Sequence, residues 1–434
     1  MGGRVAAIPN TDPAYTPPSA AGGALRAPSR GTTAAPNEQE MAQWRRWARW
    51  ARWRTHPTLR WKVKHSLLDV TLPVRAAVGA YRAVRQYGSD VARRFGVSRL
   101  HQLAQLWRAR VWYGLEGASY YRFQLYRPER WRQAGLFVEV HDSELLLRRF
   151  LGTVPKESRR IFVDKRQFAA WCAERGLPAP RTVVEVDATQ GADATAAGVR
   201  LPPKDLFSKP ANFSSGRGAR WWRYAGDGRY VGDDGRARSG EELLRELAAL
   251  SAEAQRPILV QEHLRNHRSL APLTAGGLCT VRMVTLWERG REPRLLIAVY
   301  RMPVGSAPAD NFDRGGVAAP VDVSTGTLGK ALQQHPATIA VPVERHPSTG
   351  ELIEGRKLPW WPEAVRLVVY AHTAAGSAIP TIGWDVALLE DGPLLVEANN
   401  VPCSNLSQTP SGVPLGGTPF VACLNAHFRE GFAG

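Results

Sequence analysis

Two short apolar runs near the C-terminus constrain the fold of this chain most, because each carries oxygen-bearing side chains. Residues 383–387 contain Asp385, and residues 394–399 contain Glu397 and Asn399. The intervening Glu-Asp-Gly-Pro is a turn signal, so the two runs predict a β-hairpin. Glu397 and Asn399 are two residues apart and therefore project from one face of a strand. Such hard oxygen ligands suit Mg²⁺ that also binds phosphates, whereas the alternative is a solvated hairpin edge.

Four segments precede this hairpin along the chain. Lys165 opens a helical pattern, and Lys209 stands at the exit of a short apolar strand. Residues 214–218, Ser-Ser-Gly-Arg-Gly, form a loop of small residues whose backbone N–H groups could approach phosphate closely. Residues 258–262 have the pattern of a buried strand that ends in polar groups. Each segment alone is a weak signal, and a lone lysine usually has a solvated ammonium group.

In this order, together with the hairpin, the segments resemble the ATP-grasp superfamily over about residues 135 to 410. The resemblance is greatest to the branch that contains alpha-L-glutamate ligase-like proteins and sugar-transfer-associated ATP-grasp domains. Arg301, Asn311 and Gly315-Gly316 resemble the Arg…Asn…Gly-Gly segment of ligases that add glutamate to peptide ends. The resemblance implies an α+β fold, in which two α+β subdomains clamp ATP, preceded here by a basic helical region.

The resemblance also implies roles for particular residues. Asp385, Glu397 and Asn399 would bind one or two Mg²⁺ ions, with Mn²⁺ as an alternative metal. Arg282 and Arg301 would pair with a substrate carboxylate or acyl-phosphate, and Asn311 would hold the acyl oxygen. For each arginine the alternative is a surface or structural ion pair. The residues expected to bind ATP are Lys165, Lys209, Ser215, Gly216 and Gly218 at the phosphates, and Gln261 and Glu262 beside adenine.

The positive charge of the chain is concentrated in one part of it. Residues 41–134 hold twenty Lys and Arg against four Asp and Glu, whereas the residues from 135 onward hold 34 against 32. The basic character therefore belongs to an appendage of a nearly neutral body. We predict a disordered Ala/Pro/Gly-rich tail over residues 1–38, a basic Trp/Arg-rich helical region over 39–134, and an ATP-grasp catalytic domain over 135–425.

The basic region begins with a helical pattern in which tryptophans recur at every third residue, at positions 44, 47, 50 and 53. A three-residue repeat forms a slanting band on a helix of 3.6 residues per turn. This helix could cap the ATP-grasp body with its tryptophans packed, contact an anionic membrane surface, or bind nucleic acid. Two further helical patterns, residues 67–87 and 97–113, are divided by Pro73 and by Gly88.

Cysteine usage and hydropathy indicate where the protein works. The four cysteines are widely spaced without a Cys-x-x-Cys pair, which favours reduced thiols in a cytoplasmic protein. No run of eighteen apolar residues is present, so no membrane-spanning helix is expected. A cytoplasmic location follows, with peripheral contact at the inner membrane face as a further expectation.

The resemblance implies an ATP- and Mg²⁺-dependent carboxylate–amine ligase that forms an amide through an acyl-phosphate. Its small-molecule substrates would be a carboxylate and an amine, with an amino acid attached to a glycan or peptide acceptor, as in polysaccharide biosynthesis. The alternative function is a non-catalytic ATP-binding scaffold or sensor. In that case the basic helices would dock on a membrane or a nucleic acid.

Overall fold

The computed structural model describes residues 38–55, 58, 70–162, 165–189, 199–211, 218–305, 310, 312–334 and 339–432. Three predicted site residues, Ser215, Gly216 and Asn311, lie outside the described residues. All but the last residue of the predicted N-terminal tail lies outside them as well. The other predicted site residues all lie within the described ranges.

The smaller of two antiparallel sheets has six strands in the order β1-β6-β2-β3-β4-β5. Alternation divides its two faces: Leu206 and Ser208 are buried, whereas Phe207 and Lys209 are half-buried on the other face. The buried face packs on helix α11 (Gly240–Ala254), which begins with a capping box formed by Ser239 and Glu242. The strands are β1 Thr182–Val186, β2 Leu206–Pro210, β3 Arg220–Tyr224, β4 Arg229–Val231, β5 Ala237–Ser239 and β6 Ile258–Glu262.

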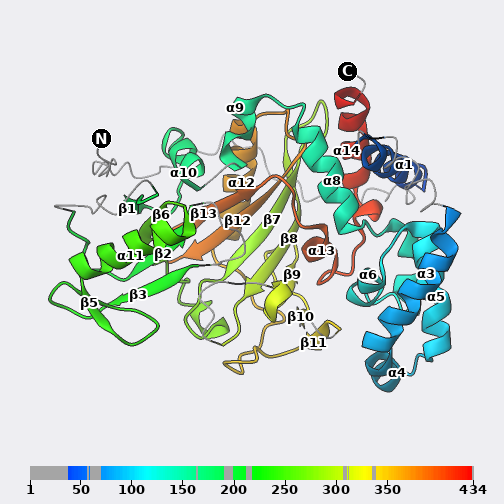
Figure 1. The fold of residues 1–434 in the computed structure, drawn as a ribbon, viewed down its shortest axis with the longest axis horizontal. Coiled ribbons are helices and arrows are strands. Elements are labelled where there is room, and N and C mark those ends of the chain that lie inside the picture. Colours follow the sequence, from blue (N-terminus) through cyan, green and yellow to red (C-terminus); the bar gives the residue numbers. More distant parts are fainter. Residues whose placement is uncertain are drawn as a thin grey trace.

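The larger sheet has seven strands in the order β11-β10-β9-β8-β7-β12-β13 and lies at the centre of the molecule (Figure 1). Almost every residue of β7 and β12 is buried, because both faces of these strands are covered. The predicted hairpin is confirmed as the antiparallel pair of β12 and β13. The strands are β7 Thr280–Leu286, β8 Arg294–Met302, β9 Val317–Val321, β10 Ala331–Gln333, β11 Val341–Val343, β12 Thr381–Leu389 and β13 Gly392–Asn399.

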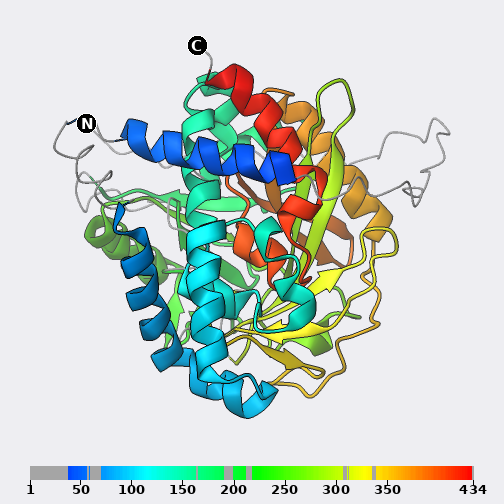
Figure 2. The same cartoon turned by 90° about the vertical axis from the view of Figure 1, so that its right-hand side faces the viewer.

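Helices from both ends of the chain cover the larger sheet. Helix α12 packs on its central strands, and α1 lies across α8 and α14 (Figure 2). Trp44 of α1 is 1% exposed and packs against Phe420 and Phe428 of α14. The structure therefore supports the interpretation of α1 as a packed cap. The helices are α1 Glu38–Thr55, α8 Val140–Leu151, α9 Lys156–Arg159, α10 Lys165–Ala173, α12 Trp361–Ala375, α13 Ser404–Gln408 and α14 Pro419–Gly431.

The remaining N-terminal helices form a second hydrophobic core beside the larger sheet (Figure 1). Buried aromatic residues fill it, among them Tyr120, Tyr121 and Phe123. Ile339, which precedes β11, joins this core and ties the helices to the body. The helices are α3 Leu72–Ala83, α4 Ser89–Phe95, α5 Arg99–Tyr113, α6 Gly117–Arg122 and α7 Pro128–Trp131.

The fold can be compared with the predictions on fold class, membrane-spanning helices and cysteines. The helices and two antiparallel sheets confirm the α+β class, with the helical N-terminal region in place. Among the described helices, none combines the length and the apolar character that crossing a membrane requires. The four cysteines are free thiols.

Candidate nucleotide and metal site

Strand register places charged residues in a row across the larger sheet. Asp385 of β12 lies opposite Glu397 of β13 on one side and opposite Arg282 of β7 on the other. Directly paired residues of antiparallel strands point to the same face, so these three side chains share a face. Asn399 is two residues after Glu397 and is paired with Gly383, which is two residues before Asp385. Its side chain therefore lies on the same face. Trp384, which alternates with Asp385, is buried in the core on the other face.

Asp385 is buried between the two predicted catalytic arginines. Its Oδ1 lies 2.5 Å from Nε of Arg282, and its Oδ2 lies 3.1 Å from Nη2 of Arg301. Burial alone would raise the pKa of Asp385, but the two guanidinium groups outweigh it and hold this pKa below its ordinary value. The arginines thus form the ion pairs that sequence reasoning gave as the alternative to substrate binding, and Asp385 is the shared partner.

Asp310 is a second acidic partner of Arg301. It was not among the predicted site residues. Its Oδ1 lies 3.3 Å from Nη2 of Arg301, and its Oδ2 accepts hydrogen bonds from the backbone N and Oγ1 of Thr280 at 2.7 and 2.6 Å. Burial raises the pKa of Asp310 to about 6, although Arg301 opposes this effect. Arg301 Nε has no hydrogen-bond partner within the described part of the chain, so it can still donate to a ligand.

Lys209, Lys165 and Glu397 come from three separate elements, and their charges interact. Lys209 is on β2 of the smaller sheet, Lys165 begins α10, and Glu397 is on β13 of the larger sheet. Burial, together with the nearby Lys165, lowers the pKa of Lys209 to about 8, although Glu397 opposes this effect. The like charges of the two lysines repel each other, and a polyphosphate placed beside them would offset that repulsion.

The predicted adenine-side residues lie at the end of β6, the strand between β1 and β2. The Gln261 amide donates to Oγ1 of Thr182 at 3.3 Å, and Glu262 forms an ion pair with Lys204 at 3.2 Å. Both side chains therefore already have protein partners.

Two aromatic rings beside this strand end were missed by sequence reasoning. Trp221 of β3 stacks on His263, with ring centroids 5.0 Å apart and planes inclined by 23°. The indole Nε1 of Trp221 and Nδ1 of His263 are buried without hydrogen-bond partners among the described residues. Strand register brings the two rings together, because Phe207 of β2 pairs with Trp221 on one side and with Gln261, two residues before His263, on the other. No local sequence pattern marks such a pair.

The proposed metal ligands fit a hard divalent cation by donor type. Asp385 and Glu397 are paired across β12 and β13, with the Asp385 oxygens also in contact with Arg282 and Arg301, and the Asn399 amide could supply its oxygen. The described residues contain no group of three or more His, Cys, Asp or Glu side chains placed to hold a metal. Mg²⁺ at a nucleotide needs only one or two carboxylates, since phosphates and water fill its other positions.

The structure thus brings most of the described predicted site residues together. Lys165 and Glu397 interact electrostatically with Lys209, and Asp385 lies between Glu397 and the two arginines. Gly218, the described end of the small-residue loop, has a φ of 71°, which glycine adopts without strain. The assignment of roles to these residues stays a prediction.

Comparison with known proteins agrees with this fold. A family model described as sugar-transfer associated ATP-grasp matches residues 149–418. No curated protein matches the chain. Solved structures that resemble it include an L-amino acid ligase from Bacillus licheniformis, with 15% identity, a TM-score of 0.36, and coverage of 64% of this chain and 52% of that one.

Two further similar structures are equally distant. A D-alanine–D-alanine ligase from Bacillus anthracis is 13% identical, with a TM-score of 0.35 and coverage of 64% and 69% of the two chains. A RimK domain ATP-grasp protein from Sphaerobacter thermophilus is 16% identical, with a TM-score of 0.29 and coverage of 61% and 69%. This chain spans about half the length of the L-amino acid ligase. Similarity at this level carries no information on substrates.

Proposed function

Because the chain belongs to the sugar-transfer-associated ATP-grasp family, we propose that it is an ATP- and Mg²⁺-dependent carboxylate–amine ligase. The electrostatic interaction of Lys209 with Lys165 and Glu397 carries this proposal, since it relates two cations to a potential metal ligand. Two ammonium groups suit the phosphates of a nucleotide, and Glu397 with Asp385 suits the metal that accompanies them. Mg²⁺, when bound, would neutralise phosphate charge during phosphoryl transfer.

Arg282 and Arg301, with their acidic partners, are the groups that we propose to bind the substrate. Arg301 Nε has no partner among the described residues and can donate to a carboxylate or acyl-phosphate oxygen. Asp310 and Thr280 hold this guanidinium in place, because each contacts its Nη2. Arg282 is held in place by its ion pair with Asp385. Asn311 would hold the acyl oxygen.

The proposed reaction has two steps, phosphorylation of the carboxylate and formation of the amide. A substrate carboxylate oxygen attacks the γ-phosphorus of ATP, the bond to the β-phosphate oxygen breaks, and ADP leaves. The amine nitrogen of the second substrate then attacks the acyl carbon, phosphate leaves with the bonding electrons, and the nitrogen loses a proton. We propose an amino acid as one substrate and a glycan or peptide as the acceptor.

An ADP-release assay tests this function. Purified full-length protein would be supplied with ATP, Mg²⁺ and pairs of carboxylates and amines, beginning with amino acids and carboxylated sugars. We expect ADP release that requires both substrates and is accompanied by one amide per ADP, detected by mass spectrometry. ADP formed at the same rate without an amine, or in the Lys209→Met variant, would contradict the ligase assignment.

We further propose a cytoplasmic location with peripheral contact at an anionic membrane. The basic residues of the N-terminal helical region support this contact, whereas Trp44 of α1 is buried and cannot supply it. A non-catalytic scaffold remains the alternative function. It predicts ATP binding without ADP release under every substrate pair.

A further inference from the structure

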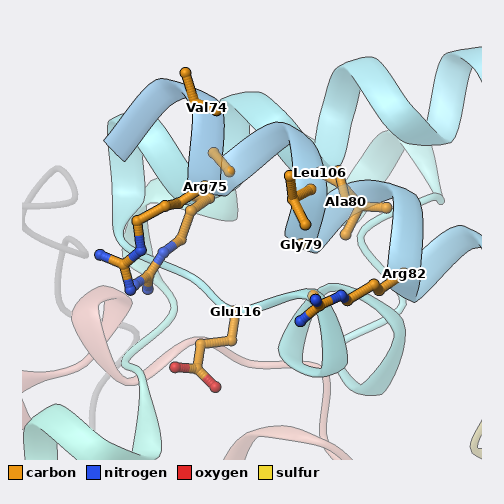
Figure 3. Close-up of a pocket in the computed structure, with 11 residues that line it drawn as sticks. Val74, Arg75, Gly79, Ala80, Arg82, Leu106 and Glu116 are labelled. Carbon is orange, nitrogen blue, oxygen red and sulfur yellow. The ribbon is translucent and has the colours of Figure 1, made fainter. Parts of the chain in front are cut away.

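A pocket of about 500 Å³ lies between α3, α5 and the start of α6, on the helical side of the molecule (Figure 3). None of the residues that line it belongs to the nucleotide and metal site. Its apolar wall includes Ala76, Ala80 and Leu106. The pocket therefore requires a separate explanation.

Three arginines give this pocket its charge. Arg75 and Arg82 extend from α3 toward the side where Glu116 lies, as Figure 3 shows, and Arg110 lines the pocket from α5. Against these three guanidinium groups, the described residues of the lining include one carboxylate, that of Glu116. That carboxylate also lies 3.9 Å from Nε2 of His141, outside the pocket lining. An excess of guanidinium groups suits a phosphate, whose oxygens accept several N–H donors at once.

The rim of the pocket is apolar and exposed. Val74, Val78 and Tyr81 of α3 are 68%, 46% and 58% exposed. Their spacing of four and three residues places them on one face of the helix, and the two valines also line the pocket. Large apolar side chains exposed beside a basic pocket indicate a ligand with both an anionic head and an apolar chain.

Gly79 leaves room in the pocket. It lies inside α3, where glycine is less favourable than alanine by about 1 kcal/mol. A Cβ added there would meet no atom within 4 Å, so packing does not require a glycine. A larger side chain at this position would occupy the pocket without displacing its wall.

We propose that this pocket binds the phosphate headgroup of an anionic membrane lipid, while the lipid chain lies against Val74 and Val78. The arginines would hold the phosphate, and the exposed row of α3 would enter the membrane interface. This assignment rests on the membrane contact of the proposed function and is independent of ligase chemistry.

Vesicle flotation tests the proposal with the full-length protein. Vesicles of phosphatidylcholine alone would be compared with vesicles that also contain phosphatidylglycerol. We expect the protein to float only with the anionic vesicles. The combined Arg75→Gln, Arg82→Gln and Arg110→Gln variant should bind them at least about tenfold more weakly. Gly79→Met should weaken binding several-fold, whereas Gly79→Ala should preserve it.

A charge-matched control variant distinguishes binding by the pocket from nonspecific electrostatic attraction between the basic protein and the anionic vesicles. Arg229, Arg236 and Arg245 are exposed on the smaller-sheet side, at the opposite end of the molecule (Figure 1). Changing all three to Gln should alter vesicle binding by less than about twofold, because salt screens charges at that distance. An equal loss in both triple variants, full binding by Gly79→Met, or complete displacement by inorganic phosphate would overturn the proposal. None of these results affects the ADP-release test.

Discussion

Lys209 holds its proton less firmly than an ordinary lysine, because it is buried and close to Lys165. With its pKa lowered to about 8, the amine is mostly neutral above that pH and must take up a proton to bind phosphate. ATP affinity should therefore fall by up to about tenfold per pH unit above pH 8. In Lys209→Arg the guanidinium stays charged, and the fall should disappear.

Calorimetry in two buffers of different ionisation enthalpy measures this proton uptake directly. The wild type should take up a fraction of a proton near pH 8, whereas Lys209→Arg should take up none. Equal proton uptake in both proteins would show that another group titrates.

The two proposed metal ligands differ in what they do for stability. Asp385 neutralises two buried arginines, so Asp385→Asn should lower the free energy of unfolding by about 3–5 kcal/mol. Glu397 is half-buried with no ion pair among the described residues, and Glu397→Gln should cost less than about 1 kcal/mol. Urea unfolding of both variants checks this difference; equal losses would mean that Asp385 is not the structural centre of the network.

The sequence predicted that the proposed ligands Glu397 and Asn399 share a face, but not which residues pair with Asp385. Period-two alternation within one hairpin was enough to place Glu397 and Asn399 on one face. The contact between Arg282 and Asp385 joins residues 103 positions apart, and it depends on β7 pairing with β12. No local pattern encodes that pairing, so Asp310 and the Trp221–His263 stack were missed for the same reason.

At the scale of elements, α1 is part of the main core. Trp44 is buried against α14, whereas Trp53, on the same helix, is 51% exposed. Trp44→Ala should therefore lower the free energy of unfolding by about 3–5 kcal/mol, and Trp53→Ala should change it by less than about 0.5 kcal/mol. Both substitutions affect helix propensity equally, so thermal or urea unfolding isolates the packing contribution. Similar losses would contradict the packed-cap interpretation.

The expected break at Gly88 was wrong. The chain stays helical from α3 to α4 through a π-helical turn, Val84–Gly88. Gln102 of α5 donates its amide to the Gly88 carbonyl at 3.1 Å, and a Cβ at position 88 would lie 2.7 Å from Val84. Glycine therefore serves close packing here and does not end the helix. A glycine therefore predicts the end of a helix only where close packing against a neighbouring element does not explain its small size.

At the scale of the whole molecule, the proposed nucleotide site draws residues from both sheets. Lys209 comes from the smaller sheet and Glu397 from the larger one, so the site forms only when both are folded and in contact. The order of motifs was sufficient to predict this α+β arrangement. The boundaries at residues 38 and 134 stay predictions, and the basic region divides in the structure between a packed α1 and a second helical core.

Calorimetric titration of ATP into the wild type and Glu397→Gln, once with Mg²⁺ and once with EDTA, measures whether a cation joins the two sheets through the nucleotide. We predict that the variant binds ATP at least about tenfold more weakly with Mg²⁺ but within about twofold of the wild type in EDTA. Equal affinities in the presence of Mg²⁺ would contradict the proposed metal and nucleotide site.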